Sequence, residues 1–223
     1  QYGLTASSIK NSLFYSSLSA TVDLVLGVII AWLLTRRKIP FAWLLDALAM
    51  LPLALPGLVL AFGYVAGFDT QGWAKNFLNP RYNPTLLLVI SYSVRRLPYI
   101  VRAAYAGFQQ TSITLEEASA NLGASPLRTL IKITLPLVAG NLIAGTILTF
   151  SFAMLEVSDG LILAMKETYY PITKAIYQII GRVDPTAPSL ASALGVVGML
   201  ILTASLLIAG RILGKKMGQL FRA

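Results

Sequence analysis

The stretch Glu117-Ala118-Ser119-Ala120-Asn121-Leu122-Gly123, followed at a fixed distance by Ile133-Thr134-Leu135-Pro136, lies between long apolar runs. It is short and polar, and it has the residue types of a well-capped helix. Polar side chains are costly inside a bilayer, so this segment is expected to lie outside the lipid. A membrane protein that keeps such a helix outside the lipid is expected to use it to contact another molecule.

The composition around this stretch is that of a membrane protein. The chain has 223 residues, of which 56% are hydrophobic and 12% charged, and its mean hydropathy is +0.71. Soluble domains carry about 25% charged residues. Because a spanning helix needs about 20 apolar residues, the length has room for five or six spans in one membrane domain covering 1–223. No signal peptide is visible, and the first residue is Gln rather than Met, which leaves open that the chain is part of a longer one.

Several kinds of site are excluded by composition. The chain contains no Cys and no His, which excludes disulfides, thiol catalysis and Cys/His metal sites. We therefore expect neither a metal nor a cofactor on this chain. The net charge of +9 does not indicate nucleic-acid binding, because the basic residues flank apolar segments, where they orient spans in the membrane.

The apolar runs predict an all-α membrane bundle with five visible spans. They cover about 12–34, 41–68, 85–108, 135–155 and 190–212, separated by polar segments that include 69–83, 109–134 and 156–188, and followed by a tail from 215 to 223. Basic clusters such as Arg36-Arg37-Lys38 and Lys215-Lys216 fall on one side of five alternating spans. By the positive-inside rule this side is cytoplasmic. The N-terminus is then outside, the C-terminus inside, 109–134 cytoplasmic and 156–188 external.

Local signals predict a helix, a turn and a second helix within 109–134. Thr114 and Glu117 fit a capping box. Glu116 and Glu117 would also lie in the first turn of the helix, where the helix dipole favours negative charge. Gly123 suits a left-handed stop, and Ser125-Pro126 suits a new helix start. Capping alone is also compatible with a simple interfacial connector.

The spacing of the whole constellation is more specific. Glu-Ala-Ser, three residues, Gly, nine residues and Ile-x-Leu-Pro resembles the cytoplasmic loop of permease subunits of binding-protein-dependent type I ABC importers, whose pattern has Ala where Ser119 stands. The resemblance extends over roughly the whole chain, including 51–57 and Leu97-Pro98-Tyr99. It implies that the short helix docks in a groove on a separate ATPase subunit. Its coupling residues would be Glu116, Glu117, Ala118, Ser119 and Gly123.

The resemblance also implies partners. These are ATPase subunits that hold ATP and Mg²⁺, a second permease subunit or domain, an extracytoplasmic substrate-binding protein and the lipid of the inner membrane. A Walker A loop is not found, since Gly210–Lys216 has the wrong spacing and no hydroxyl. The chain is therefore expected to be a non-catalytic subunit.

Ionisable residues within spans are candidates for the substrate path. Asp23 lies in the first span, where it faces the path or a neighbouring hydroxyl. Arg95 and Arg96 line an anion path, or instead snorkel or pair with Asp23 or Asp46. Three further path candidates follow from the exit of the fourth span: Ser151, Glu156 and Asp159.

Prolines mark candidate gates. Pro52, Pro56 and Pro98 each remove a helix hydrogen bond, which fits a gate lining or a bent packing helix. The double-proline pattern of the second span resembles the branch that handles ferric iron, polyamines, phosphonates, thiamine or oxyanions, with ferric iron first. The alternative is an ion-coupled secondary transporter without an ATPase, whose ion site would combine Asp23 with Arg95 or Arg96.

Overall fold

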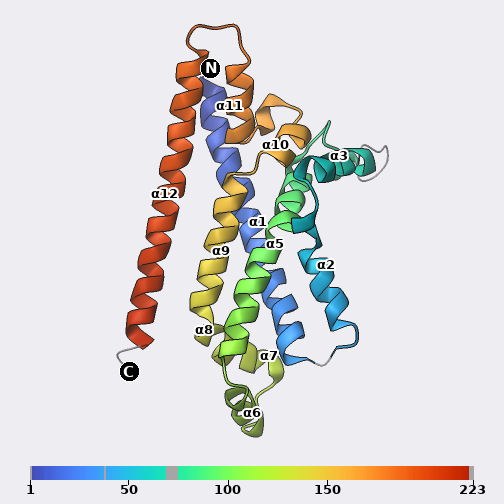
Figure 1. Cartoon of the computed structure of the whole chain (residues 1–223), viewed down its shortest axis with the longest axis vertical. Helices are drawn as coiled ribbons and strands as arrows, with labels where there is room; N and C mark the ends of the chain where they lie inside the picture. The colour runs from blue at the N-terminus through green and yellow to red at the C-terminus, as the bar shows by residue number, and fades with distance from the viewer. Residues whose placement is uncertain (1, 38, 69–74, 221–223) are drawn as a thin grey trace.

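The computed structural model describes residues 2–37, 39–68 and 75–220, and every regular element in these stretches is a helix (Figure 1). Parts of the expected loop 69–83 and of the tail 215–223 lie outside the described residues, namely 69–74 and 221–223. Lys38 of the basic cluster also lies outside them. The all-α class predicted from the apolar runs is confirmed.

Two long helices, α1 (Tyr2–Arg36) and α12 (Ala187–Leu220), are the first and last elements of the bundle. Each contains a stretch that is long and apolar enough to cross a membrane by itself, Thr5–Arg36 and Ala187–Ile208. Both start earlier than the sequence predicts. Figure 1 shows α1 running through the bundle, whereas α12 stands along one side against α9 and α11.

The expected second span is two helices rather than one. α2 (Ala42–Ala54) and α3 (Gly57–Phe68) meet at an angle of 104°, and only together do they suffice to cross a membrane. Leu55, between them, is extended with φ −95° and ψ 132°. The residue before a proline is pushed into this region, so Pro56 explains the break. Pro52 lies inside α2 without ending it.

The third predicted span is one continuous helix, α5 (Thr85–Gln110), preceded by the short α4 (Lys75–Leu78). Its 26 residues extend about 39 Å at 1.5 Å per residue. Its arginines exclude it from the helices that are apolar enough to span alone. The fold compensates by surrounding α5 with α1, α9, α2 and α10. Pro98 lies within it without a break.

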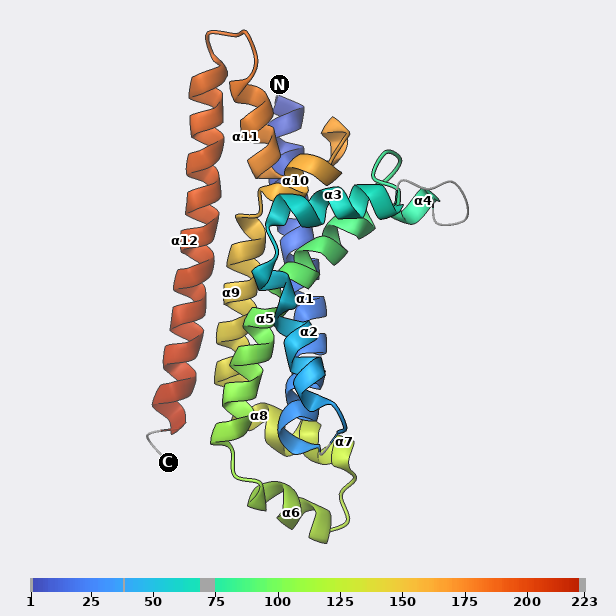
Figure 2. The same cartoon turned by 45° about the vertical axis from the view of Figure 1, so that its right-hand side comes forward.

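One end of the bundle carries a chain of short helices. α6 (Thr114–Asn121) is followed by α7 (Pro126–Thr129), the π-helix η1 (Leu130–Thr134) and α8 (Leu135–Leu137). The run 126–137 then bends by 77° into α9 (Ala139–Met154), so the fourth predicted span is also bent. Figure 2 shows α6 beyond the ends of the long helices.

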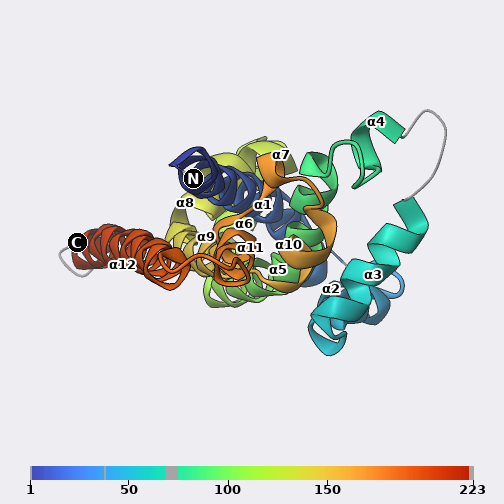
Figure 3. The same ribbon diagram turned by 90° about the horizontal axis from the view of Figure 1, so that it is seen from above.

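The opposite end holds the start of α1 and the elements of the segment predicted to be external. These are α10 (Ser158–Leu163), the 3-10 helix η2 (Glu167–Tyr169) and α11 (Ile172–Ile180). Figure 3, from above, shows α3 and α4 projecting to one side of this end. By length and composition the described chain has two spanning helices, or up to four if each bent pair is one span. α5, the third predicted span, is not among them.

Candidate functional site

The ends of α6 agree with the sequence only in part. The predicted capping box is wrong, because α6 already begins at Thr114. Its N-cap is therefore Ile113, which has no side-chain oxygen to cap the helix. Ser112, one residue before this N-cap, accepts a hydrogen bond through its Oγ from the Thr114 amide at 3.3 Å. Gly123 is confirmed in the left-handed region with φ +81°, and the Ser125 hydroxyl accepts from the Arg128 amide as expected of a cap.

The outward surface of α6 combines acid, small and apolar side chains. Glu117 and Ala118 are exposed, and Leu122 just after the helix is 89% exposed. Exposed apolar residues in a polar segment indicate a contact surface. Ser119, which the resemblance places in the coupling contact, is buried, and its hydroxyl lies 2.9 Å from that of Thr129. It therefore fastens α6 to α7.

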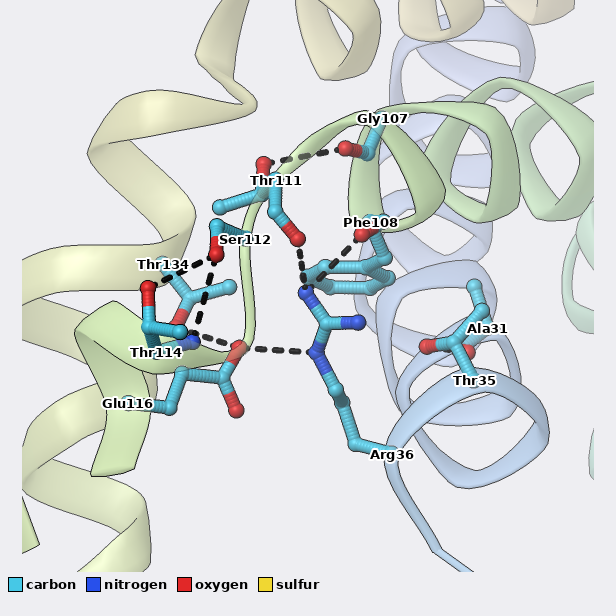
Figure 4. A network of polar contacts seen from close by, with 10 residues as sticks. All are labelled: Ala31, Thr35, Arg36, Gly107, Phe108, Thr111, Ser112, Thr114, Glu116 and Thr134. Carbon is cyan, nitrogen blue, oxygen red and sulfur yellow. Dashed lines mark hydrogen bonds and ion pairs between the residues drawn. The ribbon is translucent and has the colours of Figure 1, made fainter.

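Arg36, at the end of α1, joins α6 to the bundle (Figure 4). Its Nε donates to Glu116 Oε1 at 2.8 Å. Its Nη2 donates to the carbonyl oxygens of Phe108 and Thr111, both at 2.8 Å, at the end of α5. The Thr134 hydroxyl approaches the same Glu116 oxygen at 3.3 Å. One acid and one base thus connect α1, α5, α6 and η1.

A second ionic cluster lies towards the other end of α5. Arg96 and Arg95 both contact Glu156 Oε2, Arg95 Nε at 3.5 Å. Glu156 Oε1 accepts from the amides of Ser158 and Asp159 at 3.1 and 3.4 Å, so it also caps α10. Glu156 is therefore the acid on which α5 and α10 meet.

The arginines do not pair as the sequence suggested. Asp46 pairs with Arg102 at 3.0 Å, and Asp23 pairs with neither Arg95 nor Arg96. The sequence did not indicate Glu156 as the partner because it follows Arg96 by 60 residues. The packing of α9 and α10 on α5 brings the two side chains together.

Three other path candidates, which lie on α1, α9 and α10, are buried. Asp23 is fully buried on α1, beside Ser93, and lines a crevice of about 220 Å³ between α1 and α5. Asp159 and Ser151 are also buried. Within the described part of the chain, the carboxylates of Asp23 and Asp159 and the hydroxyl of Ser151 have no hydrogen-bond partner. These residues are not brought together with α6, which lies at the other end.

Most of the chain matches a known family. Residues 23–219 match the model of the binding-protein-dependent transport system inner membrane component. The chain belongs to this family. It is therefore an inner-membrane transport component, as the loop pattern around Glu117 predicts.

Individual relatives carry permease names. The chain is 29% identical over 93% of its length to the ferric transport system permease protein of Actinobacillus pleuropneumoniae, and spans 29% of that protein. It is 31% identical to the molybdenum transport system permease protein of Escherichia coli, covering 89% of each chain. The sulfate transport system permease protein of Salmonella typhimurium is 31% identical over 66% of this chain and 54% of its own length.

Solved permease structures share the fold. A chain of the inward-facing methionine ABC transporter MetNI superposes with a TM-score of 0.73 at 17% identity, covering 95% of both chains. A chain of a bacterial ABC transporter for the acidic polysaccharide alginate gives the same TM-score at 16% identity, over 94% of this chain and 79% of its own. At these identities the similarity concerns the fold alone.

Sequence reasoning missed three residues of the α6 region. Arg36 was assigned only to membrane orientation, Thr134 only to the spacing of the pattern, and Leu122 was not assigned. Leu122 stands at the end of the polar stretch, directly before the turn glycine Gly123, and its exposure became evident only in the structure. For Arg36, the partner lies 80 residues away and no local rule predicts it.

Proposed function

We propose that this permease-family chain forms one side of the path in an ATP-driven importer and is coupled to a separate ATPase through α6. The observation that carries the proposal is the exposed surface of α6 beyond the ends of the long helices, with Glu117, Ala118 and Leu122 turned outward. In this proposal Glu117 faces a basic residue of the ATPase. ATP and Mg²⁺ belong to that partner.

The proposed assembly has three further components. A second permease domain, identical or different, completes the path; an extracytoplasmic binding protein delivers the substrate to the end that carries α10 and α11; and lipid surrounds the apolar surfaces of α2 and α12. In this arrangement the domain 1–223 places its N-terminus outside and its C-terminus inside, with α6 in the cytoplasm. The basic residues near Arg36 support this orientation.

We propose a small solute as substrate, with ferric iron first and oxyanions second. The ferric, molybdenum and sulfate names of the relatives support both classes. The path candidates lie along the bundle; four are buried, namely Asp23, Ser151, Glu156 and Asp159, and two are partly buried, namely Arg95 and Arg96. In the proposal the break at Pro56 separates the path from the outside.

The ion-coupled alternative is less well supported. It needs a coupling-ion site that combines Asp23 with Arg95 or Arg96, but both arginines bind Glu156. Uptake driven by an ion gradient in vesicles without ATP would restore that alternative.

The test of the proposal reverses one charge on α6. Glu117→Lys is expected to abolish coupled uptake while the protein still inserts, because the new ammonium would meet the basic groove of the ATPase. Uptake and membrane content are measured in the complete transporter. Glu167→Lys, the same exchange at an exposed position at the opposite end of the molecule, is the control for insertion and membrane content. Normal uptake by Glu117→Lys at normal membrane content would refute docking through this face.

A further inference from the structure

Arg36 connects two helix ends of opposite polarity. The carbonyls that it binds, Phe108 O and Thr111 O, lie at the C-terminal end of α5, where the helix dipole favours a cation. Glu116, which it also binds, lies in the first turn of α6, where the dipole favours an anion. The guanidinium therefore satisfies both ends at once, and it is only 10% exposed.

Other connections from α6 to the long helices are sparse. A hollow of about 290 Å³ lies between α6 and the end of α1, lined among others by Trp32, Glu117 and Ala120. α6 packs mainly on α7 and η1, where Ser119 meets Thr129. Residues 111–113 join α5 to α6 along the chain. Because displacement passes through packed or bonded elements and not across a hollow, the Arg36–Glu116 pair is the direct side-chain route from α6 to α1, and through Arg36 to the last carbonyls of α5.

We infer that Arg36 is a positioning residue for energy coupling, which holds α6 in register with α1 and α5 and passes its displacement to both. The inference rests on the proposed function, in which α6 is moved by an ATPase. Thr134 of η1 supports the Arg36–Glu116 pair, because its hydroxyl donates to the same Glu116 oxygen.

The contacts of Arg36 with α5 and α6 require an arginine in particular. Its Nε and Nη2 point in different directions of a rigid plane, so that one binds Glu116 while the other binds two carbonyls. A lysine keeps the charge but brings a single nitrogen. Arg36→Lys should therefore keep the ion pair and lose part of the connection to α5.

The test measures solute transported per ATP hydrolysed by the complete transporter in lipid. Arg36→Gln is expected to lower this ratio about tenfold, within the range typical of coupling between sites. Arg36→Lys should fall between Gln and the native residue. Arg37→Gln removes the same charge one position later, from an exposed side chain stacked over Trp32, and should leave the ratio unchanged. A merely structural role would lower the amount of assembled complex and not the ratio.

A second variant keeps the inference testable if Arg36→Gln does not fold. Glu116→Gln keeps Arg36 on the α5 carbonyls and should lower the ratio in the same direction by a smaller factor. Docking is followed separately through a cysteine at Ala120 crosslinked to the ATPase. If that crosslink forms and both variants keep the native ratio, the role of Arg36 is refuted while docking stands. If no crosslink forms with Arg36 intact, the proposed function fails and this inference fails with it.

Discussion

Glu156 shows how a single residue organises the outer half of the bundle. Its one oxygen meets two arginines of α5, and its other oxygen caps α10. Its side chain is only 2% exposed. Two partly buried guanidinium groups beside this single buried carboxylate depend on it, because a charge removed from water without a partner is strongly unfavourable.

Glu156→Gln is therefore expected to destabilise the protein. Removing one partner of a buried ion pair costs about 3–5 kcal/mol. Thermal unfolding in detergent should show a clearly lower midpoint. Glu167→Gln is the matched control, since its pair with Arg182 is exposed and should contribute between about 0 and 1 kcal/mol. Equal midpoints for the two variants would mean that Glu156 does not hold the arginines together.

At the scale of elements, the close approach of α1 and α5 is the central packing contact. Buried small residues on α1, among them Ser19 and Ala31, permit it. Gly27 is the tightest point: a Cβ there would lie 2.6 Å from Ile100 Cγ2, and Ile100 is fully buried. Small residues at such a crossing let two membrane helices approach closely.

Gly27→Ala should therefore destabilise, by about 1–3 kcal/mol for an overpacked site. The control is Gly195→Ala in α12, where a Cβ would meet nothing within 4 Å among the described residues. There alanine gains up to about 1 kcal/mol of helix propensity, so the opposite sign is expected. Unfolding midpoints of both variants decide the matter, and a stabilising Gly27→Ala would disprove the tight crossing.

Local rules predicted the elements better than their partners. The interruption at Pro56, the turn at Gly123 and the cap at Ser125 each depend on a few neighbouring residues, and all three are present. Pro52 and Pro98, which were expected to interrupt their helices in the same way, lie within continuous helices. The start of α6 was wrong by one residue, which places Ile113 instead of Thr114 at the N-cap and leaves that position without a side-chain cap.

Long-range pairs were beyond the reach of the sequence. The partner of Arg36 lies 80 residues away and that of Arg96 lies 60 residues away. Several acids were chemically equivalent candidates for Arg96, and only the packing of α9 and α10 on α5 selects Glu156. The inward turn of Ser119 depends in the same way on the angle between α6 and α7.

At the scale of the whole molecule, α5 links two ionic clusters. Glu156 binds it towards the end that carries α10, and Arg36 binds its last carbonyls at the end that carries α6. Figures 1 and 2 show these ends at opposite extremes of the bundle. In the proposed importer, α5 is thus the element through which events at the ATPase reach the outer side.

The central claim, that α6 lies on the cytoplasmic side, is tested most directly by cysteine labelling. The 223 residues contain no cysteine, so Ala120→Cys and Thr168→Cys each add one reporter to this stretch, both at exposed positions at opposite ends. With a membrane-impermeant maleimide, intact cells should label Thr168→Cys and spare Ala120→Cys, whereas inverted membrane vesicles should reverse the pattern. Labelling of Ala120→Cys from the outside of sealed cells would contradict the account.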